Sequence, residues 1–145
     1  MTSYRELPGR ILRGEQELPP IAKLLGFRMT GVEPGKVTIE MTADVRHSNP
    51  MGTLHGGVLC DLADAAMGMA HATTLEDGES FTTLELKINF LKPVWSAKLK
   101  AVGVVVKRGK TVGMAQCDVT DGKDQLVARA SCTQMTLRGG QAQGR

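Results

Sequence analysis

Aromatic side chains, paired cysteines and long apolar runs are scarce or missing in this sequence. Only 3% of the residues are aromatic, so aliphatic side chains and methionines must fill the core. The three cysteines, Cys60, Cys117 and Cys132, form no CxxC pair, which argues against a disulfide framework and a zinc site. No apolar run approaches the roughly 20 residues that cross a bilayer, and the charged N-terminal segment does not resemble a signal peptide. We therefore expect a cytoplasmic protein with reduced thiols and no bound metal.

A concentration of basic residues is missing as well. The formal net charge is only +3 at pH 7, without the basic stripe that is typical of nucleic-acid-binding proteins. Hydrophobic residues make up 41% and charged residues 23%, so the composition is that of a globular domain with room for one core. We expect this domain at residues 21–137, after an N-terminal arm at 1–20 and before a disordered tail at 138–145.

The pattern of apolar residues predicts one long helix among several strands. The only long helical period runs through residues 58–75, and a shorter helical turn at 21–25 is closed by Gly26. Alternating apolar residues and turn motifs such as Pro34-Gly35 divide the rest into strands. These strands are expected at residues 27–33, 36–45, 82–90, 97–107, 111–120 and 125–137. One helix on an antiparallel sheet makes an α+β fold.

The two faces of the long helix differ in character. One arc carries the side chains expected to face the core, namely Val58, Leu59, Leu62, Ala66, Met69 and Ala70. The opposite arc carries Cys60, Asp61, Asp64, Gly68 and His71. This second arc is only weakly polar, so we expect something other than water to cover it.

A glycine pair stands near the start of this helix, and a carboxylate follows within it. Backbone N–H groups at a helix start have no intrahelical partner, and a ligand oxygen could approach them closely at Gly56 and Gly57. The helix dipole would add to the attraction, which suits a developing oxyanion. Asp64 lies in an apolar stretch, where an ionised carboxylate is costly unless it has a partner or a catalytic task. From the residues alone, an active site and an ordinary loop before a helix are equally open.

The stretch from Asn49 to Asp64 resembles the signature of hotdog-fold thioesterases of the phenylacetate-degradation (PaaI) type, relatives of the 4-hydroxybenzoyl-CoA thioesterases. The matching residues are Asn49, Gly52, His55-Gly56-Gly57 and Asp64. The resemblance covers residues 20–137, including the segment KINFLKPV after the helix. It implies a long central helix wrapped by a curved antiparallel sheet of about six strands. It also implies hydrolysis of an acyl-CoA to the free acid and CoA, with no cofactor besides the CoA of the substrate.

The resemblance assigns a role to each residue of the motif. The N–H of Gly56 would polarise the thioester carbonyl, and Asp64 would act as general base on water or as nucleophile. Asn49 would hold the water or orient the carboxylate, and His55 would position the thioester. Thr83, on the strand after the helix, matches a Ser/Thr position that assists in related enzymes.

The resemblance also suggests how CoA is held and how the chain assembles. Lys107, Arg108 and Lys110 form a basic hairpin tip that could bind the CoA phosphates, with Gly57 as a further contact. The family builds its site between two subunits that contribute the carboxylate and the oxyanion donor separately. We therefore expect an obligate homodimer, paired into a homotetramer.

Other assignments and functions are less favoured. Cys60 has no adjacent base, His47 and His71 lack the spacing of metal ligands, and Asp61 is expected to complement the helix dipole. A hotdog-fold acyl-thioester dehydratase or hydratase is an alternative, although the acid follows HGG at the thioesterase spacing. A non-catalytic acyl-CoA-binding protein ranks last, because no helix-turn-helix pattern is present. Aryl-acetyl, hydroxylated aromatic and medium-chain acyl groups all remain open as substrates.

Overall fold

The computed structural model describes residues 3–144 and contains one long helix on an antiparallel sheet. The helices are α1 (Leu7–Leu12), α2 (Pro20–Leu25) and α3 (Gly56–Ala72), with 3-10 turns at Val45–His47 and Gly139–Ala142. The strands are β1 (Arg28–Glu33), β2 (Lys36–Ala43), β3 (Ser80–Phe90), β4 (Ala97–Arg108), β5 (Val112–Thr120) and β6 (Leu126–Leu137). The predicted long helix and strands are thus confirmed to within a few residues at their ends.

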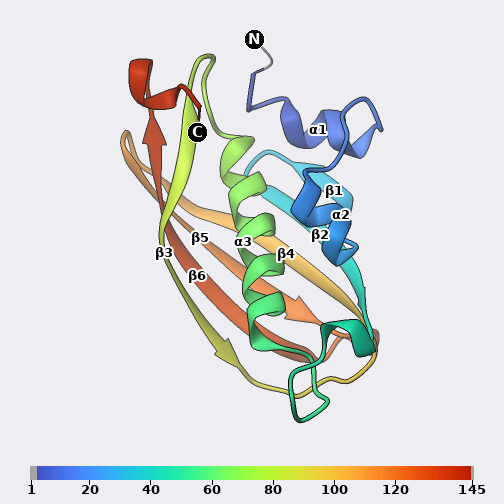
Figure 1. The fold of residues 1–145 in the computed structure, drawn as a ribbon. Helices are drawn as coiled ribbons and strands as arrows, with labels where there is room; N and C mark the ends of the chain where they lie inside the picture. The colour runs from blue at the N-terminus through green and yellow to red at the C-terminus, as the bar shows by residue number, and fades with distance from the viewer. Residues whose placement is uncertain (1–2, 145) are drawn as a thin grey trace.

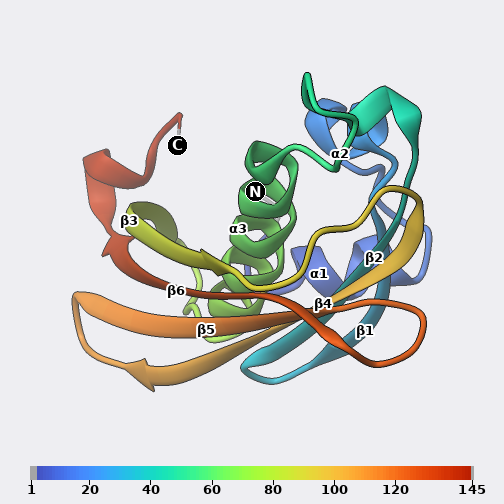
Figure 2. The same cartoon turned by 90° about the horizontal axis from the view of Figure 1, so that it is seen from below.

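The sheet is a single curved layer in the order β1-β2-β4-β5-β6-β3, and every pair of neighbours is antiparallel. Helix α3 lies across its concave face (Figure 1). Seen from below, the sheet curves around α3, with β3 on one side and β1 and β2 on the other (Figure 2). This is the predicted α+β arrangement of one long helix wrapped by a curved antiparallel sheet. Strands β1 and β3 are its two edges.

The core lies between α3 and the concave face of the sheet. The helix contributes mostly small or flexible side chains, which are Leu59, Leu62, Ala63, Ala66, Met67 and Ala70. Val58 and Met69, which were also expected in the core, are only partly buried. Small side chains allow the helix to lie close to the strands, as dense packing requires.

The chain's own sheet covers part of the helix face that was expected to need another cover. Gly68 and His71 are buried, and a Cβ atom at Gly68 would lie 3.2 Å from the ring of Phe81 on β3. The ring of Phe81 also contacts that of His71, with 5.4 Å between the centroids. The chain's own Phe81 therefore covers Gly68 and leaves no open approach for a second backbone at this glycine.

Strand β3 changes phase in its middle. The sequence predicts one unbroken alternation that puts Thr82, Leu84, Leu86, Ile88 and Phe90 on the same face. The pairing of β3 with β6 instead shifts between Thr83 and Glu85. A bulge of this kind reverses which residues face the core on its two sides. Thr83 consequently points toward α3, while Leu84 is 55% exposed.

Within residues 3–144, the segments before β1 and after β6 both carry structure. Residues 1–20 were expected to form a loosely attached arm, yet α1 contacts β1 and α3, and Pro8 is fully buried. The expected tail at 138–145 contains the 3-10 turn Gly139–Ala142. Within residues 3–144, no helix combines the length and the apolar character that crossing a bilayer requires.

We expect Gly103→Ala to destabilise the fold, because β4 meets the backbone of α3 at this residue. A Cβ atom on Gly103 would lie 2.4 Å from the carbonyl carbon and oxygen of Ala66. Overpacking of this kind typically costs about 1–3 kcal/mol. Urea denaturation should show this loss in the free energy of unfolding. Gly122→Ala is the matched control, since nothing lies within 4 Å of its added Cβ. Equal stability of the two variants would contradict the packing described here.

Candidate active site

The start of α3 presents one backbone donor. His55 is the N-cap residue, and its Nδ1 accepts a hydrogen bond of 2.9 Å from the N–H of Gly57. The N–H of Gly56 has no acceptor within residues 3–144. A Cβ atom on Gly56 would lie 2.8 Å from the ring of Phe90, so a side chain here would collide with that ring. Of the two glycines, Gly56 therefore offers a donor, and the N–H of Gly57 is already used.

The capping contact also sets the state of the His55 ring. A neutral imidazole that accepts at Nδ1 carries its proton on Nε2. The His55 side chain is exposed, so this N–H is free to donate to a ligand at the helix start. Such a donor agrees with the predicted role of His55 in positioning a thioester.

Asn49 organises the loop that leads to the helix. Its Oδ1 accepts hydrogen bonds from the N–H groups of Met51 at 3.0 Å and Thr53 at 3.2 Å. Its Nδ2 donates to Thr53 Oγ1 at 2.7 Å. Asn49 and Gly56 line a common cavity of about 390 Å³ together with Phe90. The side chain of Asn49 therefore holds the loop in place beside the N–H of Gly56.

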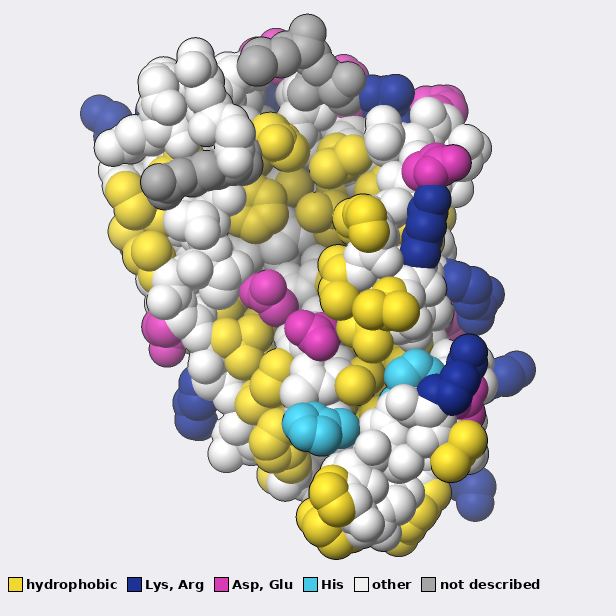
Figure 3. Space-filling view, in the orientation of Figure 1, with side chains coloured by type: hydrophobic (Ala, Val, Ile, Leu, Met, Phe, Trp, Pro, Cys, Tyr) yellow, Lys and Arg dark blue, Asp and Glu magenta, His cyan; other side chains and the backbone are white. Residues whose placement is uncertain are grey.

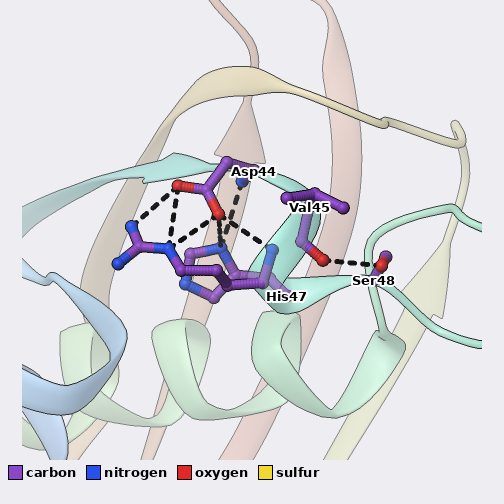
Figure 4. Close-up of polar contacts among 5 residues, drawn as sticks. Asp44, Val45, His47 and Ser48 are labelled. Atoms are coloured by element: carbon purple, nitrogen blue, oxygen red, sulfur yellow. Dashed lines mark hydrogen bonds and ion pairs between the residues drawn. The ribbon is translucent and has the colours of Figure 1, made fainter.

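A capping box fixes the base of this loop (Figure 4). Asp44 Oδ1 accepts from the N–H of Arg46 at 2.9 Å, and the N–H of Asp44 donates to His47 Nδ1 at 3.1 Å. The hydrogen bonds from Arg46 hold the pKa of Asp44 well below its usual range. The carbonyl of His47 in turn accepts from the N–H of His55 at 2.9 Å, which ties the box to the helix cap. His47 is thus a structural residue of the site.

Asp64 and Thr83 meet across the space between α3 and β3. Thr83 Oγ1 donates a hydrogen bond of 2.9 Å to Asp64 Oδ1, and both side chains are partly buried. The bulge in β3 makes this contact possible, since it turns Thr83 toward the helix. The sequence analysis named both residues, and the structure brings them together.

An apolar cavity of about 610 Å³ lies on the other side of Asp64. Its walls come from α3, from Phe27 just before β1, from the strand residues Met29 and Ile39, and from the N-terminal arm. The face over α3 shows acidic side chains bordered by hydrophobic surface (Figure 3). Asp61 also lines the cavity, and partial burial together with the Asp64 carboxylate raises the pKa of Asp61.

The predicted catalytic residues fall into two groups within one chain. Asn49, His55 and Gly56 lie at the start of α3, whereas Asp64 and Thr83 lie further along it. Eight residues of helix separate Gly56 from Asp64, or about 12 Å at 1.5 Å per residue. Asp64 is absent from the walls of the cavity at the helix start. One chain therefore does not bring the N–H of Gly56 and the carboxylate of Asp64 to the same point.

The basic hairpin tip is only partly available to a ligand. Lys107 and Lys110 are exposed, but Arg108 pairs with the buried carboxylate of Glu79 at 3.1 Å. Arg138 contacts the other oxygen of Glu79 at 2.6 Å. The sequence analysis missed Glu79, which follows a turn and has no local pattern that marks it as buried. Arg108 was expected to contact phosphate, but in the structure it neutralises the buried carboxylate of Glu79.

His71 and Cys60 are poorly suited to catalysis. His71 is fully buried, and its Nε2 lies 3.3 Å from Thr136 Oγ1. Burial, with a smaller effect of Arg108, lowers the pKa of His71 to about 4. Burial and the nearby Asp61 and Asp64 raise the pKa of Cys60, so its thiol stays protonated. Neither residue takes part in a group of three potential metal ligands within residues 3–144.

Comparison with known proteins relates the chain to thioesterases. A family model described as the thioesterase superfamily matches residues 51–128. Human acyl-coenzyme A thioesterase 13 is 28% identical over 136 residues, which cover 92% of this chain and 96% of the human protein. A phenylacetic acid degradation-related protein of Ralstonia eutropha JMP134, whose structure is solved, is 32% identical with a TM-score of 0.81. That match covers 88% of this chain and 98% of the other.

The solved structure of the Escherichia coli PaaI protein, from the phenylacetic acid degradation operon, has the same fold. It superposes with a TM-score of 0.82 over 96% of this chain and 98% of its own, at 23% identity. The predicted hotdog fold and the resemblance to PaaI-type proteins are confirmed. The segment matched by the family model includes His55, Gly56, Asp64 and Thr83.

We expect the buried His71 to make the fold sensitive to acid. The folded protein binds a proton at this ring more weakly than the unfolded chain, with a pKa of about 4 against 6.5. The unfolded state therefore takes up the proton first, and stability falls as the pH drops from 6.5 toward 4. Between pH 7 and pH 5 the free energy of unfolding should fall by about 2 kcal/mol.

Urea denaturation at several pH values tests this expectation. His71→Gln removes the titrating ring and should lose this part of the pH dependence, although its stability at pH 7 will be lower. Glu79 and Arg108 are the charged groups nearest to the ring, so Glu79→Gln serves as a second comparison. The assignment to His71 fails if His71→Gln keeps the full loss of stability between pH 7 and pH 5.

Proposed function

Because the chain belongs to the thioesterase superfamily and is a thioester hydrolase, we propose that it hydrolyses an acyl-CoA with Asp64 as its catalytic carboxylate. The name of human acyl-coenzyme A thioesterase 13 supports CoA as the thiol part of the substrate. The observation that carries the proposal is the contact between Thr83 Oγ1 and Asp64 Oδ1 beside an apolar cavity. One carboxylate oxygen is held by Thr83, which leaves Oδ2 to face the substrate. The cavity is of a size that suits an acyl group.

The proposed reaction needs one base and one oxyanion donor. Asp64 takes a proton from a water molecule as the water oxygen attacks the thioester carbonyl carbon. The carbonyl oxygen becomes an oxyanion that accepts a hydrogen bond from the N–H of Gly56 at the positive end of the helix dipole. The carbon–sulfur bond then breaks, CoA leaves as a thiolate, and the proton on Asp64 passes to the sulfur. Direct attack by Asp64 through a transient anhydride is the other course that the same residues allow.

We propose that the active unit is a homodimer in which two chains share each site. The separation of Gly56 from Asp64 along α3 supports this, since one chain cannot direct both at one carbonyl. Edge strand β3 supports it further, because a long strand with exposed Leu84 and Phe90 is open to pairing with another chain. The family resemblance extends the proposal to a tetramer made of two such dimers.

The CoA phosphates are proposed to lie near Lys107 and Lys110. Both side chains are exposed and positively charged, and phosphate oxygens would complement them. Arg108 is already paired with Glu79, so its contribution would require giving up a buried partner. The tip lies beside the end of α3 that carries His71, since His71 Cε1 is 3.0 Å from the position of a Cβ on Gly113. The tip thus lies near the end of α3 that is far from Gly56 of the same chain. A CoA whose thioester sits at Asp64 would therefore place its phosphates at the tip of the chain that supplies Asp64.

Substitution of Asp64 tests the proposed function directly. Asp64→Asn keeps an oxygen that accepts from Thr83 but removes the base, so kcat for acyl-CoA should fall roughly a hundredfold or more. Release of free CoA thiol over a panel of acyl-CoAs provides the measurement. Asp61→Asn is the matched control on the same helix and should have a modest effect. Comparable losses at both positions would overturn the assignment of Asp64, and a wild-type protein inactive on every acyl-CoA would overturn the function.

Mixing two inactive variants tests whether the site is shared between chains. Gly56→Pro removes the oxyanion donor at the first helical position, which accepts proline once the exposed ring of Phe90 turns aside, and Asp64→Asn removes the base. In a mixed dimer, Gly56 from one chain and Asp64 from the other restore one of two sites. Co-expression should therefore recover about a quarter of wild-type activity, since about half of the dimers are mixed. A mixture as inactive as its parents, or a fully active monomer by light scattering, would exclude a shared site.

A further inference from the structure

We propose that the N-terminal arm, through its residues 7–20 and the adjoining Ile21 of α2, determines which acyl groups the enzyme accepts. This inference rests on the proposed function, because it identifies the cavity beside Asp64 as the acyl site. The arm supplies a whole wall of that cavity, and its lining residues include Leu7, Ile11, Leu18 and Ile21. The remaining walls come from α3 and the first two strands. An acyl group whose carbonyl sits at Asp64 would extend toward the arm.

The arm is fixed firmly enough to act as a wall. Pro8 at the start of α1 is fully buried, and α1 contacts both β1 and α3. The chain reverses after α1 at Gly14, which has a positive φ of 74°, and the N–H of Glu15 donates to the carbonyl of Arg10 at 2.9 Å. Leu18 then packs against the core before α2 begins. The arm therefore limits the depth of the cavity in the folded state.

The chemistry of the walls selects for apolar acyl groups. Leu18 and Ile11 line the cavity together with Met29 and Ile39, and among its described lining residues the neutral polar side chain is the exposed amide of Gln16. The arm's Glu17 is exposed and paired with Lys23. A hydroxyl group buried among the aliphatic side chains, away from Gln16 and the two aspartates, would lose its hydrogen bonds to water without replacement. Asp61 and Asp64 would also repel a negatively charged acyl group.

These observations narrow the substrate class. Of the acyl groups that the sequence leaves open, hydroxylated aromatic groups fit these walls least. Medium-chain and unsubstituted aryl-acetyl groups carry no polar substituent beyond the thioester. Their burial therefore breaks the fewest hydrogen bonds to water. The length that is accepted depends on the arm, because the arm contributes Leu7, Ile11 and Leu18 to the cavity wall.

Substitutions that change the depth of the cavity test the inference. Leu18→Trp and Ile11→Trp fill it, whereas Leu18→Ala enlarges it. For each full-length variant, kcat/KM is measured with acetyl-, octanoyl-, dodecanoyl- and phenylacetyl-CoA. We expect the ratio of kcat/KM for dodecanoyl-CoA over acetyl-CoA to fall roughly tenfold or more with either Trp, since steric misfit of this size is strongly discriminating. Leu18→Ala should shift the preference toward longer chains.

Leu12→Trp is the matched control for these variants. Leu12 is next to Ile11 in α1 but is 42% exposed and does not line the cavity. Its substitution should leave the ratio unchanged, and thermal unfolding identifies any variant that is not folded.

Opposite shifts from Leu18→Ala and the Trp variants would support the inference even if one variant were unstable. The inference is overturned if the wild type hydrolyses acyl-CoA but every arm variant keeps its chain-length profile. Absence of any acyl-CoA hydrolysis by the wild type would instead defeat the proposed function.

Discussion

The close approach of α3 to the centre of the sheet is the constraint on which the rest of the structure depends. The backbone at Ala66 occupies the space that a side chain on Gly103 would need, and further buried alanines continue the contact along the helix. Tight packing of this kind leaves the helix little freedom to rotate or to lift from the sheet. With that rotation set, Asp64 faces the space between β3 and the N-terminal arm. The orientation of the carboxylate is therefore decided in the core.

The parts of the structure that follow local rules could be predicted from the sequence. Gly26 ends α2 with a left-handed φ of 78°, as expected of a glycine after a short helical turn. The alternating apolar residues predicted the strands, and the helical period of apolar residues predicted α3. The HGG motif and Asp64 could be recognised because they lie in one continuous stretch that resembles a known family. Local pattern thus sufficed for the fold, and the motif sufficed to propose the principal site residues.

What could not be predicted depends on contacts between distant parts of the chain. The orientation of Thr83 depends on a bulge that no glycine or proline marks in the sequence of β3. Arg108 was expected to be free because its partner, Glu79, is 29 residues away and lies in an ordinary polar turn. The arm was expected to be loose because the burial of Pro8 arises only when α1 packs on β1 and α3. In each case the missing information was tertiary.

The capping bond of His55 has a consequence for the kind of ester that the site can cleave. The Nδ1 atom of His55 accepts a hydrogen bond from the N–H of Gly57 and caps the helix. Nδ1 therefore cannot take up a proton during the reaction without losing that hydrogen bond. In the proposed mechanism, Asp64 alone must then carry the proton, and no second acid assists the departing group. A thiolate is stable enough to leave unaided, whereas an alkoxide is far more basic and requires protonation as the bond breaks. Asp64 returns its proton to the leaving group in that mechanism, so a thiolate, which can depart before the proton arrives, is the leaving group that a site with a single proton carrier suits best.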